Sequence, residues 1–302
     1  MGTRLRPTGR ALGFTMIELL VAMVIFGFVG AMIVNFFGRH MKFRGDTEIQ
    51  AETHQGLNAA FDALARDIRL AGACLPHQPM FVPIDGQNNS SPTPDTITLR
   101  TGVVSGNTTC VQATLQTATA AGATTLSVDN LAGFTVNKYA FINGTSTGEY
   151  FQVQSLSGSS GAGTVTSATG LVNAYPASSG VYAVLERTYS IDTVNFPTTS
   201  NPVPTLVMRI DRATASGQPV NIPVAANIDR LDIQYRENQG CTPGPCTVVD
   251  MPADNATWNQ VSEVLVSMRA RSSINQSTRQ PFFESAGPIA IQPRNLLAYR
   301  PN

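Results

Sequence analysis

The hydrophobic pattern of the chain opens with an almost unbroken apolar run. From Leu19 to Phe37 nearly every residue is apolar, and one carboxylate, Glu18, stands at the start of the run. A helix over residues 14–37 would be about 36 Å long at 1.5 Å per residue. That length is enough to cross the hydrocarbon core of a bilayer. The pattern therefore predicts a membrane-spanning helix over 14–37.

An amphipathic pattern follows. Apolar residues recur at intervals of four, three and four positions, as on one face of a helix; we call them the apolar stripe: Leu57, Phe61, Leu64 and Ile68. No proline occurs between Phe14 and Leu75, so nothing forces a break. We expect the helix to continue over 38–74 and to stop near Gly72, just before Pro76.

After Pro76 the pattern changes to alternation of apolar and polar residues. The runs that alternate are 96–99, 150–153, 181–185, 206–211, 231–236 and 264–271. Such runs, separated by Gly, Pro, Asn and Ser, predict an antiparallel sheet. We therefore expect an α+β fold, in which the long N-terminal helix lays its apolar stripe on a β-rich head over 75–302.

Small residues interrupt this head in its first half. The stretches 117–125 and 155–169 are rich in Ser, Thr, Gly and Ala. Such composition is typical of loops and short strands. We expect residues 111–190 to form an inserted β-rich subdomain.

Charge is sparse and unevenly placed. The formal net charge is zero and only 13% of residues are charged, so specific nucleic-acid binding is not expected. Arg4, Arg6 and Arg10 lie together before the apolar run, which predicts a cytoplasmic N-terminus and a translocated head. No small-residue cleavage site follows Phe37. The expected cut is therefore at Gly13, before the apolar run.

The residues around that cut resemble a known signal. Gly13-Phe14-Thr15-x-x-Glu18, followed by Leu19-Leu20-Val21, resembles the type IV prepilin cleavage and methylation signal. The resemblance implies that prepilin peptidase removes residues 1–13 as a leader and methylates Phe14. It also implies that Glu18 pairs with the terminal amine of a neighbouring subunit and sets its register. Such a partner would explain an intramembrane carboxylate, which costs about 2.5–3.5 kcal/mol on insertion scales.

Three later segments resemble the PilW group of minor pilins: 64–72, the strand after Trp258, and Pro293-Arg294-Asn295. This resemblance implies a minor pilin that primes or joins type IV pilus assembly. The implied partners are major and minor pilins, prepilin peptidase and the inner-membrane assembly platform. The implied location is the inner membrane, crossed once with the head in the periplasm, and then the pilus filament at the cell surface.

Two other functions stay open at this point. One is a minor pseudopilin of type II secretion, similar to GspJ, because the N-terminal signal is shared between the two systems. The other is a pilus-associated adhesin, in which the 111–190 insertion binds a ligand and mediates cell adhesion.

The four cysteines are an even number in an exported head, which favours disulfides. Pro243-Gly244-Pro245 would close a turn between Cys241 and Cys246, so we expect a local bridge there. The remaining pair, Cys74 and Cys110, would tie the helix end to the early sheet. The alternative is a zinc site made by all four thiolates, although the usual C-x2-C spacing is absent.

No arrangement of residues predicts catalysis. The sequence shows no Ser/His/Asp order, H-E-x-x-H motif or phosphate-binding loop. We therefore expect no enzyme, no catalytic residue, no cofactor and no metal. His40, His54 and His77 are expected to be surface residues. Residues 85–89 could suggest calcium but lack the EF-hand pattern, so we expect a turn there. Trp258 is expected to be an anchor in the core or at the sheet edge.

Overall fold

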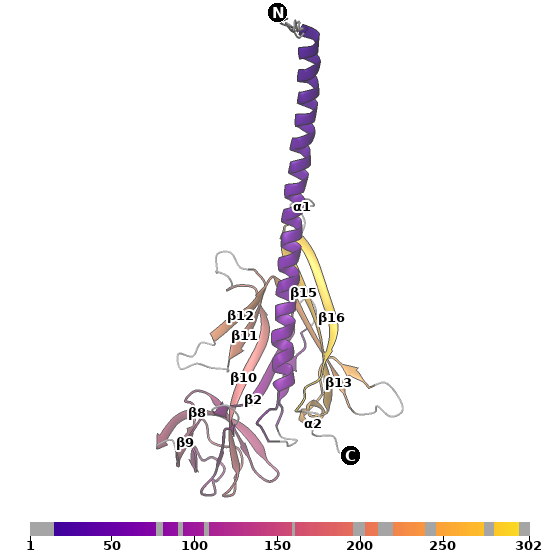
Figure 1. The fold of residues 1–302 in the computed structure, drawn as a ribbon. Helices are drawn as coiled ribbons and strands as arrows, with labels where there is room; N and C mark the ends of the chain where they lie inside the picture. The colour runs from indigo at the N-terminus through magenta and orange to yellow at the C-terminus, as the bar shows by residue number, and fades with distance from the viewer. Residues whose placement is uncertain are drawn as a thin grey trace, which may run out of the picture.

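The computed structural model describes residues 15–76, 81–89, 93–105, 109–158, 161–195, 203–210, 220–238, 246–274 and 281–295. Helix α1 (Met16–Leu70) has 55 residues and is about 83 Å long at 1.5 Å per residue. Its N-terminal half projects away from the head as a single column, and its C-terminal half lies against the sheets (Figure 1). The predicted long N-terminal helix is thus confirmed.

The C-terminal half of α1 packs through the apolar stripe. All four stripe residues are buried in one core with residues of both large sheets. The helix ends at Leu70, and Gly72 follows with a φ of 81°. This left-handed conformation suits glycine and commonly terminates helices.

Within the described residues, the head contains two large antiparallel sheets and a small one. Its strands are β1 (Ile84–Gln87), β2 (Thr96–Gly102), β3 (Val104–Ser105), β4 (Thr109–Cys110), β5 (Gln112–Thr114), β6 (Thr125–Val128), β7 (Tyr139–Asn143), β8 (Gly148–Gly158), β9 (Gly163–Ser167), β10 (Gly180–Asp192), β11 (Thr205–Ile210), β12 (Val220–Ala226), β13 (Ile228–Glu237), β14 (Val248–Val249), β15 (Val261–Ile274) and β16 (Pro281–Ile291), and a short helix, α2 (Asn255–Trp258), precedes β15.

The larger sheet has ten strands in the order β1-β2-β10-β7-β8-β9-β6, with β11 and β5 also paired to β10 and β12 paired to β11. The second sheet has the order β14-β13-β15-β16, and β3 pairs with β4. Every strand pair is antiparallel. The α+β class is therefore confirmed.

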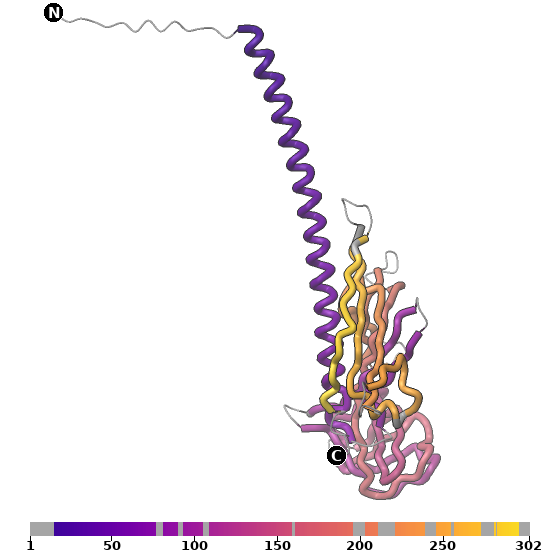
Figure 2. Tube along the Cα trace, turned by 90° about the vertical axis from the view of Figure 1, so that its right-hand side faces the viewer, coloured from indigo at the N-terminus to yellow at the C-terminus, as the bar shows by residue number. Residues whose placement is uncertain are grey.

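The head has two main hydrophobic cores. The first joins α1 to strands of both large sheets. The second is built from residues 111–183 and lies at the end of the head farthest from the start of α1 (Figures 1 and 2). Strand β10 belongs to both, because its first half pairs with β5 and β7 and its second half with β2 and β11. The 111–190 segment therefore has a core of its own but shares β10 with the rest of the head.

Two local expectations differ from the structure. The turn expected at residues 85–89 is wrong, since Ile84–Gln87 forms strand β1 and pairs with β2. Strand β16 was not expected, although it runs beside α1 (Figure 2). It is an edge strand whose described side chains are mostly at least partly exposed, so its sequence carries no clear alternation of buried and exposed positions.

Candidate assembly site

Glu18 lies in the first turn of α1 and closes a capping box with Thr15. The backbone N–H and the hydroxyl of Thr15 both donate to Glu18 Oε2 at 3.0 Å. In return, the Glu18 N–H donates to Thr15 Oγ1 at 3.4 Å. These bonds satisfy groups that have no partner inside the helix. Glu18 therefore has a local role that our sequence interpretation missed, although Thr15-x-x-Glu18 fits the capping-box pattern.

The following half of α1 presents apolar side chains to its surroundings on all sides. The large exposed ones between residues 16 and 43 include Met16, Phe26, Val34 and Met41. By length and composition this helix could cross a membrane, and its apolar window is not covered by any part of the described chain. A helix that is hydrophobic all round needs an apolar environment, either lipid or other helices.

Glycines in this half have open space on their outer side within the described chain. A Cβ placed on Gly27, Gly30 or Gly38 would meet nothing within 4 Å. Small residues let two helix backbones approach closely in an apolar setting. The open faces at these positions are thus free for a neighbouring helix.

The head holds the other end of α1 through polar contacts. The buried carboxylate of Asp67 accepts a hydrogen bond from the Tyr189 hydroxyl at 2.7 Å and faces Arg187 Nη1 at 3.4 Å. Burial and this hydrogen bond raise the pKa of Tyr189, so the phenol remains a donor. The Asn295 side chain donates to the carbonyls of Leu70 and Ala71 at 3.4 and 3.3 Å. The C-terminal segment thereby caps the helix.

The cysteines that the structure describes are in disulfides. A disulfide joins Cys74 to Cys110, with 5.2 Å between their Cα atoms, and it ties the segment after α1 to β4. Because these two thiols are oxidised, the four-thiolate zinc site is wrong. Cys246 is also in a disulfide, whereas Cys241 lies outside the described residues, so the predicted Cys241–Cys246 pair stays a prediction.

The remaining candidate residues lie apart from each other. His54 is exposed, with Nδ1 at 3.7 Å from Glu284 Oε1, and the His40 ring contacts Phe36 on the exposed half of α1. Trp258 is buried against Tyr235 with ring centroids 4.7 Å apart, as expected of a core anchor. His77, Gly13 and Phe14 lie outside the described residues. Among the described residues, no group of histidine, cysteine and acidic side chains could hold a metal ion.

Comparison with known proteins matches one segment. Residues 9–34 fit the family model of the prokaryotic N-terminal methylation motif. No curated protein matches the chain. The matched span contains the Gly13-Phe14 junction, Glu18 and the first part of the exposed apolar helix. The chain thus carries a type IV pilin-like methylation signal at the start of a long apolar helix, which supports membrane anchoring and a protein of the pilin or pseudopilin kind.

Proposed function

We propose that this protein is a minor pilin similar to the PilW group, which joins or primes a type IV pilus through α1. The supporting observation is the uncovered apolar half of α1, which follows a methylation signal and begins with a carboxylate. Its partners are other pilins, prepilin peptidase and the inner-membrane assembly platform. No enzymatic step is part of this function.

In this proposal the helix changes one apolar environment for another. Before assembly it spans the inner membrane, with the head in the periplasm. On extraction, helices of neighbouring subunits cover its apolar side chains, and each Å² kept from water contributes about 25 cal/mol. The head leaves this half of α1 free on every side, as filament packing requires (Figure 2).

Glu18 sets the position of one subunit along its neighbour. Both hydrogen bonds from Thr15 end on Oε2, and no described residue bonds to Oε1. That oxygen is available to the methylated terminal amine of an adjacent chain. Fixing register is the best-attested use of a buried polar group.

The first prediction concerns processing. We expect the protein isolated from cells to begin at Phe14 with a methylated amine, because the signal lies at residues 9–34. Mass spectrometry of the intact protein and of its N-terminal peptide measures both. A mature chain that begins at Met1, or after the apolar run, would contradict the proposal.

The same signal also serves type II secretion, so a minor pseudopilin similar to GspJ is the alternative assembly function. The partners distinguish the two. Cross-linking in cells and purification of the full chain should recover pilins if the proposal holds. Recovery of secretion-system pseudopilins instead would replace it.

A pilus-associated adhesin is a second candidate because the 111–183 core lies at the end of the head farthest from the apolar N-terminal half of α1. Deleting all of 111–190 would remove most of β10 and damage both cores. A narrower excision is available, since Thr114 and Gly180 face each other across β5 and β10. An Asn-Gly turn can join two antiparallel strands at such a pair.

Replacing residues 115–179 by Asn-Gly is expected to leave pilus incorporation intact, because α1 and the first core keep their residues. Incorporation is measured by immunoblotting of sheared pili, and attachment by counting adherent cells. Protection of Cys74 and Cys110 from alkylation controls for folding. Loss of attachment alone would favour the adhesin, and loss of incorporation by a folded variant would show that the insertion acts in assembly.

A further inference from the structure

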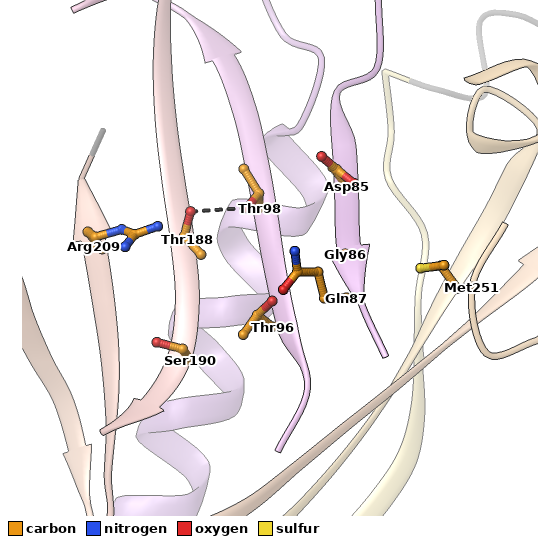
Figure 3. Close-up of a pocket in the computed structure, with 9 residues that line it drawn as sticks. All are labelled: Asp85, Gly86, Gln87, Thr96, Thr98, Thr188, Ser190, Arg209 and Met251. Atoms are coloured by element: carbon orange, nitrogen blue, oxygen red, sulfur yellow. Dashed lines mark hydrogen bonds between the residues drawn. The ribbon is translucent and has the colours of Figure 1, made fainter. Parts of the chain in front are cut away.

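A polar groove lies on the larger sheet, on the face opposite α1 (Figure 3). Its volume is about 640 Å³, within the range usual for small-molecule sites. Nine residues line it: Asp85, Gly86, Gln87, Thr96, Thr98, Thr188, Ser190, Arg209 and Met251. Four neighbouring strands, β1, β2, β10 and β11, supply eight of these residues, and Met251 follows β14.

Strand alternation explains why polar side chains collect there. Ile97 and Leu99 of β2 and Tyr189 of β10 are buried in the core with α1. Successive side chains of a strand point to opposite faces, so Thr98 and Thr188 point away from the helix. The polar side chains at alternate positions of these strands thus form the floor of the groove.

One row of side chains crosses the four strands. Asp85 pairs with Thr98, Thr98 with Thr188, and Thr188 with Arg209 in the strand registers. With strands about 4.8 Å apart, the row is about 14 Å long. A carboxylate stands at one end and a guanidinium at the other, with two hydroxyls 3.0 Å apart between them. Gln87 adds an amide beside this row (Figure 3).

The two charged ends differ in their partners. Asp85 faces Arg100 at 3.3 Å, and Arg100 in turn binds the buried Glu186. Arg209 Nε is buried and has no hydrogen-bond acceptor in the described chain. A buried donor without an acceptor is costly. The Arg209 end of the groove therefore has a donor that a ligand could satisfy with a hydrogen-bond acceptor, preferably an anionic one.

We propose that this groove binds a saccharide that carries a carboxylate. The guanidinium of Arg209 would hold the carboxylate, since arginine binds such groups through paired charge-assisted hydrogen bonds. The threonine hydroxyls, Gln87 and Asp85 offer donors and acceptors for sugar hydroxyls. Met251 offers an apolar contact at the rim.

An extended peptide fits this floor poorly. Strand β2 is paired on both sides, with β1 and β10, and β10 is paired with β2 and β11. Their backbone groups are thus already used by the sheet, so a peptide cannot add as a strand to β2 or β10. What remains exposed are hydroxyl, amide and charged side chains, which match a polyhydroxylated ligand.

Titration calorimetry of the full chain in detergent micelles tests the proposal. The acidic probes are sialyllactose and trigalacturonate, the neutral ones lactose and galactotriose, and triglutamate represents an acidic peptide. We expect an acidic saccharide to bind at least about tenfold more tightly than its neutral counterpart. Arg209→Gln should weaken that binding at least about tenfold, and Thr98→Val with Thr188→Val should also weaken it.

Arg271→Gln is the matched control, because Arg271 is an exposed arginine of β15 that does not line the groove. It should bind as the unmodified chain does. Circular dichroism checks that each variant is folded. If the double threonine variant is unfolded, Arg209→Gln alone is used to test the proposal. No binding of either acidic saccharide at about 10 mM, equal binding of neutral saccharides, unchanged binding by Arg209→Gln, or equally tight binding of triglutamate would each overturn the proposal.

Discussion

Glu18→Gln is expected to exclude the protein from pili while leaving the start of α1 intact. Glutamine can replace glutamate in a capping box, so the bonds with Thr15 keep a partner. The negative charge is lost, however, and in the proposed filament this leaves the terminal amine of the neighbouring subunit unpaired among apolar helices. Breaking a buried ion pair in this way costs about 3–5 kcal/mol, so incorporation should fall more than about a hundredfold. Immunoblotting of sheared pili measures it.

Two further variants show whether the effect comes from the charge of Glu18. One removes the helix cap and keeps this charge, and the other removes a different acid of α1. Thr15→Ala removes the capping hydroxyl and keeps the carboxylate, so it should weaken the helix start by about 0.5–2 kcal/mol and still enter pili. Glu48→Gln changes an exposed acid of α1 that lies beyond the apolar run, and it should behave like the unmodified protein. If Glu18→Gln entered pili at the normal level, the register function of Glu18 would be ruled out.

Arg100→Met is expected to destabilise the head by about 3–5 kcal/mol, because it leaves the carboxylate of Glu186 buried without its cation. Arg100 and Glu186 are only 4% and 3% exposed, and Arg100 Nε donates to Glu186 Oε2 at 2.8 Å. Arg100 also donates to the carbonyl of Val82 and lies over the ring of Tyr150, 5.0 Å from its centroid. Urea unfolding followed by circular dichroism measures the loss.

The double variant Arg100→Met/Glu186→Leu should regain most of the lost stability, because replacing both members of a buried pair by apolar residues is often neutral. A surface pair provides the control. Arg230 and Asp232 are half exposed and 3.4 Å apart, so Arg230→Met should cost less than about 1 kcal/mol. An equal loss in Arg100→Met and Arg230→Met would contradict the role given to the buried pair.

The elements with regular periodicity could be predicted from the sequence. The apolar stripe identified the face of α1 that packs on the head, and Leu231, Ile233 and Tyr235 identified the buried face of β13. In both cases one face is buried and the other is not, so the residue pattern records the packing directly.

Other features depend on contacts that periodicity does not encode. Arg100 lies at a polar position of an alternating strand, which indicates a solvent-facing residue, yet Tyr150 and Glu186 cover it. The contact of Asn295 with the end of α1 joins residues 224 and 225 positions apart. The groove requires the pairing order of β1, β2, β10 and β11, and alternation within one strand does not determine which strands are neighbours.

The disulfide between Cys74 and Cys110 has a mechanical consequence. It directly links the segment after α1 to β4 and closes a covalent loop that contains β1 and β2. If α1 is pulled along its axis while a residue beyond Cys110 is held, the force passes through the disulfide. It does not pass along the loop between the two cysteines. In the proposed pilus, the strands that carry Asp85 and Thr98 would therefore not bear the tension on the fibre, and their side chains would keep their positions while the chain on either side is under strain.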